Sequence, residues 1–113
     1  MTDTNVVTIV GRLTKDAELK RNPGLSVGFF TIATNRKKKD SSNGNFVEEA
    51  SFIDINVFGK YAETITPSLK KGVLVCVAGS VKQERWQERA TGQSRSRVVI
   101  AADSIQIFGG RQQ

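Results

Sequence analysis

The stretch SFIDINVFGK, residues 51–60, alternates between two kinds of side chain along its length. Successive side chains of a β-strand point to opposite faces, so Ile53, Ile55 and Val57 fall on one face and can line a hydrophobic core. The opposite face carries the remaining side chains: Phe52, Asp54, Asn56 and Phe58. The stretch therefore predicts a strand with one buried face and one wetter face that nevertheless holds two phenylalanines.

Length and composition around this strand indicate one compact domain. The chain has 113 residues, of which 38% are hydrophobic and 25% charged, and this is enough for a single core. It has no apolar run that approaches a membrane span and no apolar signal segment near its start. Its lone cysteine, Cys76, excludes an internal disulfide and suits a reducing compartment. We therefore expect a cytoplasmic protein without membrane contact.

The net charge of +6 points to an anionic partner, while the residues needed for most chemistry are missing. The chain has no histidine, and a single cysteine leaves no zinc site. Neither a GxGxxG nor a GxxxxGK[ST] phosphate loop occurs. The carboxylates have the spacing of strand-surface charges: Glu48, Glu49, Asp54 and Asp103. We expect no catalytic residue, no metal site and no cofactor.

Five segments carry strand patterns, and a sixth has helical spacing. The predicted strands are residues 5–13, 25–39, 46–59, 72–88 and 94–108. The helical segment, residues 60–72, is interrupted by Pro67, so we expect a helix to about Ile65 and then a new turn capped by Thr66. This order predicts an all-β fold, a five-stranded Greek-key OB-fold barrel with one short helix between strands 3 and 4. A β-sandwich needs more strands than these.

The barrel is expected to occupy residues 1–108. Residues 109–113 then form the start of a flexible tail.

Four aromatic residues are candidates for stacking on nucleic-acid bases. Phe52 and Phe58 lie six residues apart, about 20 Å at strand rise, and bracket polar side chains. Trp86 follows the apolar part of its strand and is surrounded by arginines, a pattern typical of nucleic-acid binding. Phe30 suits the core, and Phe29, the preceding residue, therefore points to the opposite face of its strand. The alternative for each ring is packing in the core or beneath a loop.

Basic residues form a second set of candidates. The run Arg36-Lys37-Lys38-Lys39 stands at the mouth of a predicted hairpin, where it is either simply solvated or part of a track for phosphates. Such a track would also include Arg12, Lys15, Lys82 and Arg85, and further arginines surround the tryptophan. The predicted phosphate contacts are Arg12, Lys15, Arg36, Lys37, Lys38, Lys39, Lys82, Arg85, Arg95 and Arg97.

The predicted strand at residues 72–88 is apolar on both faces. Val73, Val75 and Val77 can fill the barrel interior, so the second apolar face needs a cover, which is either the helix or another subunit. The first strand has the same outward apolar character. The predicted oligomer interface consists of Val6, Val10, Leu74, Cys76 and Ala78.

Blocks along nearly the whole chain resemble, in the same order, those of bacterial single-stranded DNA-binding proteins. The blocks are VTIVGRLTKDAEL, FTIATNRKKKD, FIDINVFGKYAETI, LKKGVLVCVAGSVKQERW and ADSIQIFG. The resemblance implies an OB-fold, a homotetramer, and single-stranded DNA wrapped through aromatic stacking and basic residues. It places Phe52, Phe58 and Trp86 at base-stacking positions, whereas Lys38 stands at a fourth such position.

The chain also departs from this family in three places. Ser96 stands where an aromatic residue is frequent, and Pro67 is unexpected in the helix. Family members usually continue through a long tail to an acidic tip that recruits other proteins, whereas this sequence stops at GGRQQ. Recruitment of replication and repair proteins is therefore not carried over.

These observations favour sequence-independent binding and protection of single-stranded DNA in replication, recombination and repair, at the nucleoid. Two alternatives stay open. One is an OB-fold accessory protein for primosome assembly or RNA binding. The other is a protein–protein adaptor, which would bind no nucleic acid through its basic track.

Overall fold

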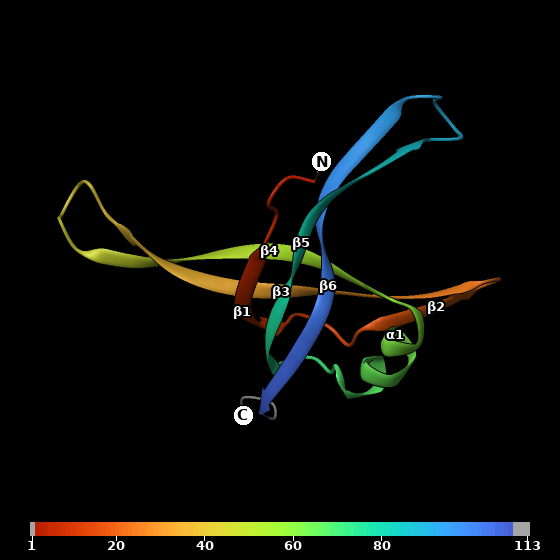
Figure 1. Ribbon diagram of the computed structural model, residues 1–113. Coiled ribbons are helices and arrows are strands. Elements are labelled where there is room, and N and C mark those ends of the chain that lie inside the picture. The colour runs from red at the N-terminus through yellow and green to blue at the C-terminus, as the bar shows by residue number, and fades with distance from the viewer. Residues whose placement is uncertain (1, 110–113) are drawn as a thin grey trace.

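The structure, a computed structural model, describes residues 2–109 and is dominated by long strands (Figure 1). Its elements follow one another as β1 (Val7–Leu13), β2 (Glu18–Asn22), β3 (Leu25–Lys39), β4 (Phe46–Phe58), α1 (Gly59–Ile65), a 3-10 turn (Thr66–Ser68), β5 (Leu74–Gln87) and β6 (Ser94–Gly109). The predicted tail residues 110–113 lie outside the described part of the chain. Gly109 is the last residue of β6.

Five of the strands close into a barrel, which confirms the predicted OB-fold. The sheet has the order β1-β5-β6-β4-β3-β2, and additional pairing between β1 and β3 closes it. The β4–β6 pair is parallel and the others are antiparallel. Closure depends on Gly11, because a Cβ atom there would lie 2.6 Å from the Ala33 carbonyl oxygen. Only a residue without a side chain lets the two backbones approach so closely.

The short strand β2 was not predicted. It ends at a turn in the stretch KRNPG, residues 20–24, where Gly24 has a φ of +89°. The residues before the turn pair with β3, from Glu18 opposite Phe29 to Asn22 opposite Leu25. Apart from Leu19 this strand is polar and exposed, so it has no apolar alternation of its own. The β3 edge imposes its conformation.

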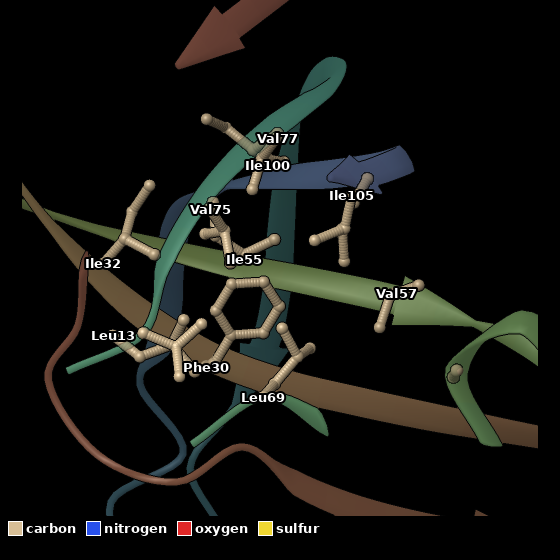
Figure 2. Close-up of a cluster of buried hydrophobic side chains, with 13 residues drawn as sticks. Leu13, Phe30, Ile32, Ile55, Val57, Leu69, Val75, Val77, Ile100 and Ile105 are labelled. Carbon is tan, nitrogen blue, oxygen red and sulfur yellow. The ribbon is translucent and has the colours of Figure 1, made fainter. Parts of the chain in front are cut away.

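The barrel core contains the side chains that the alternation assigned to it (Figure 2). Ile55 and Val57 are buried, and Val75 and Val77 face them across the barrel interior. Asn56 corrects the prediction of a uniformly wetter face on β4, because it is only 2% exposed. The reason is a pairing between segments distant in sequence: the parallel ladder with β6 places Ala101 directly beside Asn56.

The helix closes one end of the barrel, packing mainly against β3 and β4 (Figure 1). As expected, α1 ends at Ile65 and Pro67 lies in a new turn. The assignment of Thr66 as N-cap was wrong, because Ile65 holds that position. The Thr66 hydroxyl instead donates a 2.6 Å hydrogen bond back to the Ala62 carbonyl. This hydroxyl fits under β3 because Gly28 has no Cβ, which would lie 2.7 Å away.

Two hairpins extend beyond the barrel in different directions (Figure 1). We call residues 36–49 the β3–β4 arm and residues 82–97 the β5–β6 arm. Pairing between β3 and β4 continues without a register shift from Val27 opposite Phe58 to Lys39 opposite Phe46. Side-chain parity within the β3–β4 ribbon is therefore preserved from the barrel to the arm.

Candidate nucleic-acid interface

Register places three of the predicted stacking residues on one face of the β3–β4 ribbon. Phe29 pairs with Asn56, and the cross-strand partners of Phe52 and Phe58 on β3 have the same parity as Phe29. Phe52 is 67% exposed, whereas Phe29 and Phe58 are half-buried. The face that the sequence assigned to aromatic contacts therefore exists, and one of its rings is largely open to solvent.

A lysine lies over each of the two half-buried rings. Lys20 Nζ is 5.3 Å from the ring centroid of Phe29, and Lys82 Nζ is 4.9 Å from that of Phe58. Both distances are within the range of about 6 Å over which a cation is attracted to the face of an aromatic ring. Lys82 was predicted as a phosphate contact. Lys20 was missed because it lies on the unpredicted strand β2.

A groove of about 760 Å³ runs along this aromatic face. It brings together Lys15, Phe29, Phe52 and Arg97 from separate predicted sets. The full lining is Thr14, Lys15, Asp16, Glu18, Lys20, Phe29, Phe30, Thr31, Phe52, Asp54, Ile55, Asn56 and Arg97. Aromatic rings, cations and carboxylates thus share one concave surface.

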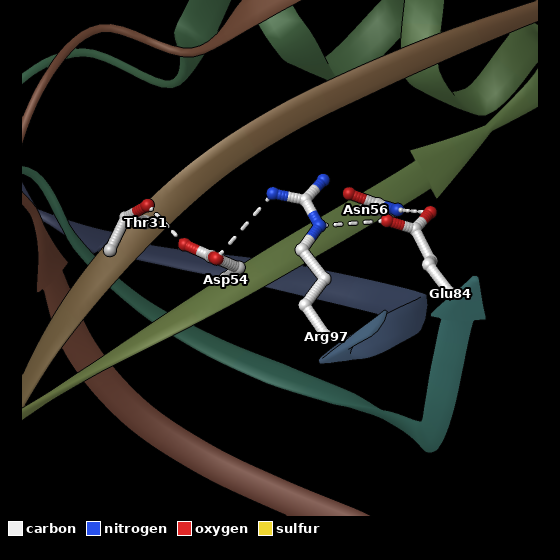
Figure 3. Close-up of polar contacts among 5 residues, drawn as sticks. All are labelled: Thr31, Asp54, Asn56, Glu84 and Arg97. Atoms are coloured by element: carbon white, nitrogen blue, oxygen red, sulfur yellow. Dashed lines mark hydrogen bonds and ion pairs between the residues drawn. The ribbon is translucent and has the colours of Figure 1, made fainter. Parts of the chain in front are cut away.

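A network of polar side chains from β3, β4, β5 and β6 lies at the groove (Figure 3). Arg97 donates from Nε to Glu84 Oε1 at 2.9 Å, and its Nη1 lies 3.7 Å from Asp54 Oδ2. The Thr31 hydroxyl donates to Asp54 Oδ1 at 2.7 Å, and Asn56 Nδ2 donates to Glu84 Oε2 at 2.8 Å. Two carboxylates therefore compete with any phosphate for the Arg97 guanidinium. Sequence reasoning identified Arg97 as a cation but missed both of these partners.

Trp86 lies on the β5–β6 arm and is 46% exposed. Lys82, Glu84 and Trp86 are alternate residues of β5, so their side chains point to the same face of that strand. Lys82 contacts Phe58 and Glu84 contacts Asn56, both on β4, so Trp86 extends the aromatic face onto the β5–β6 arm. It borders a second hollow of about 420 Å³. The lining of this hollow is Gln83, Arg85, Trp86, Gln87, Ser94, Arg95 and Ser96.

The arginines beside Trp86 have local partners. Arg85 Nη2 donates to Gln83 Oε1 at 2.8 Å, and Arg95 Nε is bonded to the Glu88 carboxylate. These contacts hold both guanidinium groups along the surface of the arm. Arg85 and Arg95 both line the hollow next to the tryptophan.

The basic run on the β3–β4 arm divides between two faces. Lys37 and Lys39 have the parity of Phe29 and so lie on the aromatic face of the ribbon. Arg36 and Lys38 lie on the opposite face, where Lys38 Nζ is 3.6 Å from Glu49 Oε2. The four cations predicted as one track thus belong to two surfaces.

Arg12 and Lys15 differ in position although the sequence placed them together. Lys15 lines the groove. Arg12 donates from Nη1 to the Gly72 carbonyl at 3.0 Å, next to the loop that enters β5. Of these two cations, Lys15 is the one that the fold brings to the aromatic face.

The predicted interface residues gather on the outer side of β1 and β5. Val10 pairs directly with Cys76, and Leu74 and Ala78 follow with the same parity on β5. Val6 and Val10 are exposed, while the three β5 side chains are partly covered. The helix, which packs mainly against β3 and β4, does not account for a cover over this face.

The helices and the metal-ligating residue types within residues 2–109 bear on two other functions. No helix in this range has the length and apolar character that crossing a bilayer requires. The same residues contain no cluster of three or more acidic, cysteine or histidine side chains placed to hold a metal ion.

Comparison with known sequences gives consistent matches. Residues 4–108 match the single-strand binding protein family. A single-stranded DNA-binding protein of Treponema pallidum is 44% identical over 110 residues, covering 96% of this chain and 60% of that protein. One from Borreliella burgdorferi is 42% identical over 109 residues, covering 96% of this chain and 72% of that protein. The chain thus spans about two thirds of the length of these relatives.

Comparison with solved structures supports the same fold. A deletion mutant of the single-stranded DNA binding protein from Thermus aquaticus superposes with a TM-score of 0.83 at 28% identity, covering 96% of this chain and 52% of that one. A Plasmodium falciparum SSB in complex with ssDNA gives a TM-score of 0.85 at 20% identity, covering 96% and 98% of the two chains. The second likeness concerns the fold alone.

Proposed function

The chain belongs to the single-strand binding protein family, and from this premise we propose that it binds single-stranded DNA without sequence preference. The observation that carries the proposal is the shared face of Phe29, Phe52 and Phe58, whose groove also holds cations. Bound strands would be protected during replication, recombination and repair, and this activity would place the protein at the nucleoid.

The proposed mechanism divides binding between bases and phosphates. Bases stack on exposed rings such as Phe52 and Trp86, and each stacked base contributes about 1–3 kcal/mol whatever its identity. Lysines beside the rings neutralise phosphates, and the release of counterions makes affinity fall as salt rises. Because every base has an aromatic face and every nucleotide a phosphate, this arrangement tolerates any sequence.

Titration of Trp86 fluorescence with oligo(dT) at two salt concentrations tests the proposal. Trp86 is the only tryptophan of the chain, so its emission reports on one site. We expect strong quenching on binding and weaker affinity at the higher salt concentration. An unchanged emission spectrum at saturating DNA would contradict stacking on Trp86. Tighter binding of an RNA of matched sequence would favour the accessory role instead.

We further propose that the protein assembles as a homotetramer through the outer side of β1 and β5. Val10, Cys76 and their apolar neighbours form a contiguous patch, and patches of this kind usually mark an interface. Symmetric closed assemblies with two-fold axes bury the same patch of every copy.

Cys76→Arg tests the assembly. It would bury an unpaired charge in the proposed interface, at a cost of several kcal/mol, and should give dissociation or aggregation. Equilibrium sedimentation at micromolar concentration measures the mass, with Cys76→Ser as the uncharged control. A monomer mass for the unsubstituted protein would contradict the interface even if DNA binding persisted.

A further inference from the structure

Phe46 is a large apolar side chain exposed near the tip of the β3–β4 arm. It is 67% exposed, the same fraction as Phe52. The arm extends away from the barrel as a two-stranded ribbon (Figure 1), so the core offers the ring no shelter. Covering such a ring with an aromatic or apolar group is favourable, so the position is suited to a stacking partner.

Strand parity places this ring in line with the predicted stacking residues. Phe46, Phe52 and Phe58 lie at intervals of six residues on β4, each about 20 Å from the next at strand rise. The β3–β4 ladder has no register shift between them, so all three rings belong to one face of the ribbon. The aromatic face therefore extends for about 40 Å, from the barrel to the tip of the arm.

The turn that precedes Phe46 is well defined. The backbone N–H of Asp40 donates to the Asn45 carbonyl at 2.7 Å, and that of Gly44 donates to the Asp40 carbonyl at 2.9 Å. The Ser42 hydroxyl and the Ser42 backbone N–H both donate to the Asp40 carboxylate. These two hydrogen bonds, the hydroxyl's more than the N–H's, lower the pKa of Asp40 below its ordinary value. This hydrogen-bonded turn fixes where β4 begins and hence the face on which Phe46 lies.

The surroundings of the ring select the chemistry of its partner. Lys39 is directly opposite Phe46, and Lys37 follows on the same face. Neither lysine has an ion pair within the described residues. Lysine is depleted at the centres of protein interfaces, whereas a ring beside free cations suits a base and its phosphate.

We propose that Phe46 is an additional base-stacking residue, which carries single-stranded DNA from the groove onto the β3–β4 arm. The inference rests on the proposed function and deepens it. The family resemblance placed stacking positions at Phe52, Phe58, Trp86 and the position of Lys38, and Phe46 is none of these. Lys38 lies on the opposite face of the arm, so Phe46 takes over base contact in this region.

Relocating the single tryptophan tests the proposal directly. In one variant Phe46→Trp is combined with Trp86→Phe, and in its matched control Val47→Trp is combined with Trp86→Phe. Val47 is the next residue along, is also exposed, and lies on the opposite face. Oligo(dT) of about 16 nucleotides, the upper end of the site size for one OB-fold, should quench the tryptophan at position 46 strongly and the one at position 47 weakly.

Affinity measurements give the second readout. Phe46→Leu keeps an apolar side chain but removes the ring, and it should weaken binding of the long oligonucleotide at least about fivefold. Binding of an oligonucleotide of about 5 nucleotides, which fits within the groove, should change little. Phe52→Leu serves as the reference for the proposed function and should weaken both oligonucleotides.

Three outcomes would overturn the inference. Equal quenching of the tryptophans at positions 46 and 47 would show that DNA does not prefer the face of the ribbon that carries Phe46. Unaltered affinity of Phe46→Leu beside weakened Phe52→Leu would remove Phe46 from the site and leave the proposed function intact. A protein that binds neither oligonucleotide, with or without substitutions, would fail the proposed function and this inference together.

Discussion

The two arms carry similar residues but arrange them differently. On the β5–β6 arm, Arg97 and Arg95 are bonded to carboxylates of Glu84 and Glu88. On the β3–β4 arm, Lys38 pairs with Glu49 on one face, while the lysines of the other face have no ion pair within residues 2–109. The β5–β6 arm has five basic residues and the β3–β4 arm has four, but the arms differ in which of these cations are already paired with carboxylates.

The comparison shows that whether a basic side chain already has a carboxylate partner matters more for phosphate binding than whether it is a lysine or an arginine. A carboxylate beside an arginine already neutralises part of its charge, so a phosphate that binds the remaining N–H donors gains less. A solvated lysine loses only water and counterions. We therefore expect the β5–β6 arm to bind mainly through Trp86, and the β3–β4 arm to add phosphate contacts of Lys37 and Lys39 to the base contact proposed for Phe46.

The largest expected effect is the loss of the ring at Trp86. Trp86→Ala should weaken oligo(dT) binding by about 1–3 kcal/mol and leave the slope of log affinity against log salt unchanged, because stacking releases no counterions. Fluorescence anisotropy of a labelled oligonucleotide measures both quantities. Val98→Ala, at an exposed residue of β6 that directly follows this arm, is the matched control and should bind normally. A changed salt slope in Trp86→Ala would break the contrast between the arms.

An intermediate effect is expected for the lysines of the β3–β4 arm. Replacing Lys37 and Lys39 by Gln should weaken all oligonucleotides alike and reduce the salt slope by about 0.7 for each phosphate that is no longer neutralised. Lys38→Gln is the control, since this lysine lies on the opposite face beside Glu49. An equal reduction of the slope by Lys38→Gln and by Lys37→Gln or Lys39→Gln would contradict this prediction. It would mean that lysines on both faces of the ribbon contact phosphates and that the run acts as one track.

The smallest effect is expected for Asp54→Asn, and its direction is a gain. The change removes one of two carboxylates that hold Arg97, and it should tighten DNA binding by about 0.2–1 kcal/mol, the range of an exposed ion pair. Glu63→Gln makes the same change of net charge at a carboxylate paired with Arg21, and it should have less effect. Weaker binding by Asp54→Asn would mean that the network positions the groove rather than restrains its charge.

Much of the fold was predictable because its signals are local. Alternation along residues 51–58 identified β4 and its buried face, and Pro67 marked where α1 gives way to a new turn. The strand β2 was not predictable in this way, since pairing with β3 and not its own apolar pattern makes it a strand. Burial of Asn56 has the same origin in a contact distant in sequence.

The candidate site was predictable by residue type and less so by arrangement. Strand parity correctly grouped Phe29 with Phe52 and Phe58 once the hairpin register was known. Residue types alone did not reveal that Lys20 lies over Phe29, because that contact requires β2. Nor did they reveal which cations have carboxylate partners, because the Arg97 network joins side chains from four strands.

The continuous β3–β4 ribbon has a consequence for colloidal behaviour. Beyond Ala33, β3 has only β4 as a paired strand within the described residues, so one edge of the ribbon keeps its backbone donors and acceptors unpaired. Exposed edges of this kind template pairing between molecules, and lysines along them oppose it by mutual repulsion. By this principle we expect the run from Arg36 to Lys39 also to oppose edge-to-edge aggregation of the free protein. Polyanions that neutralise this run without covering the edge would remove the protection.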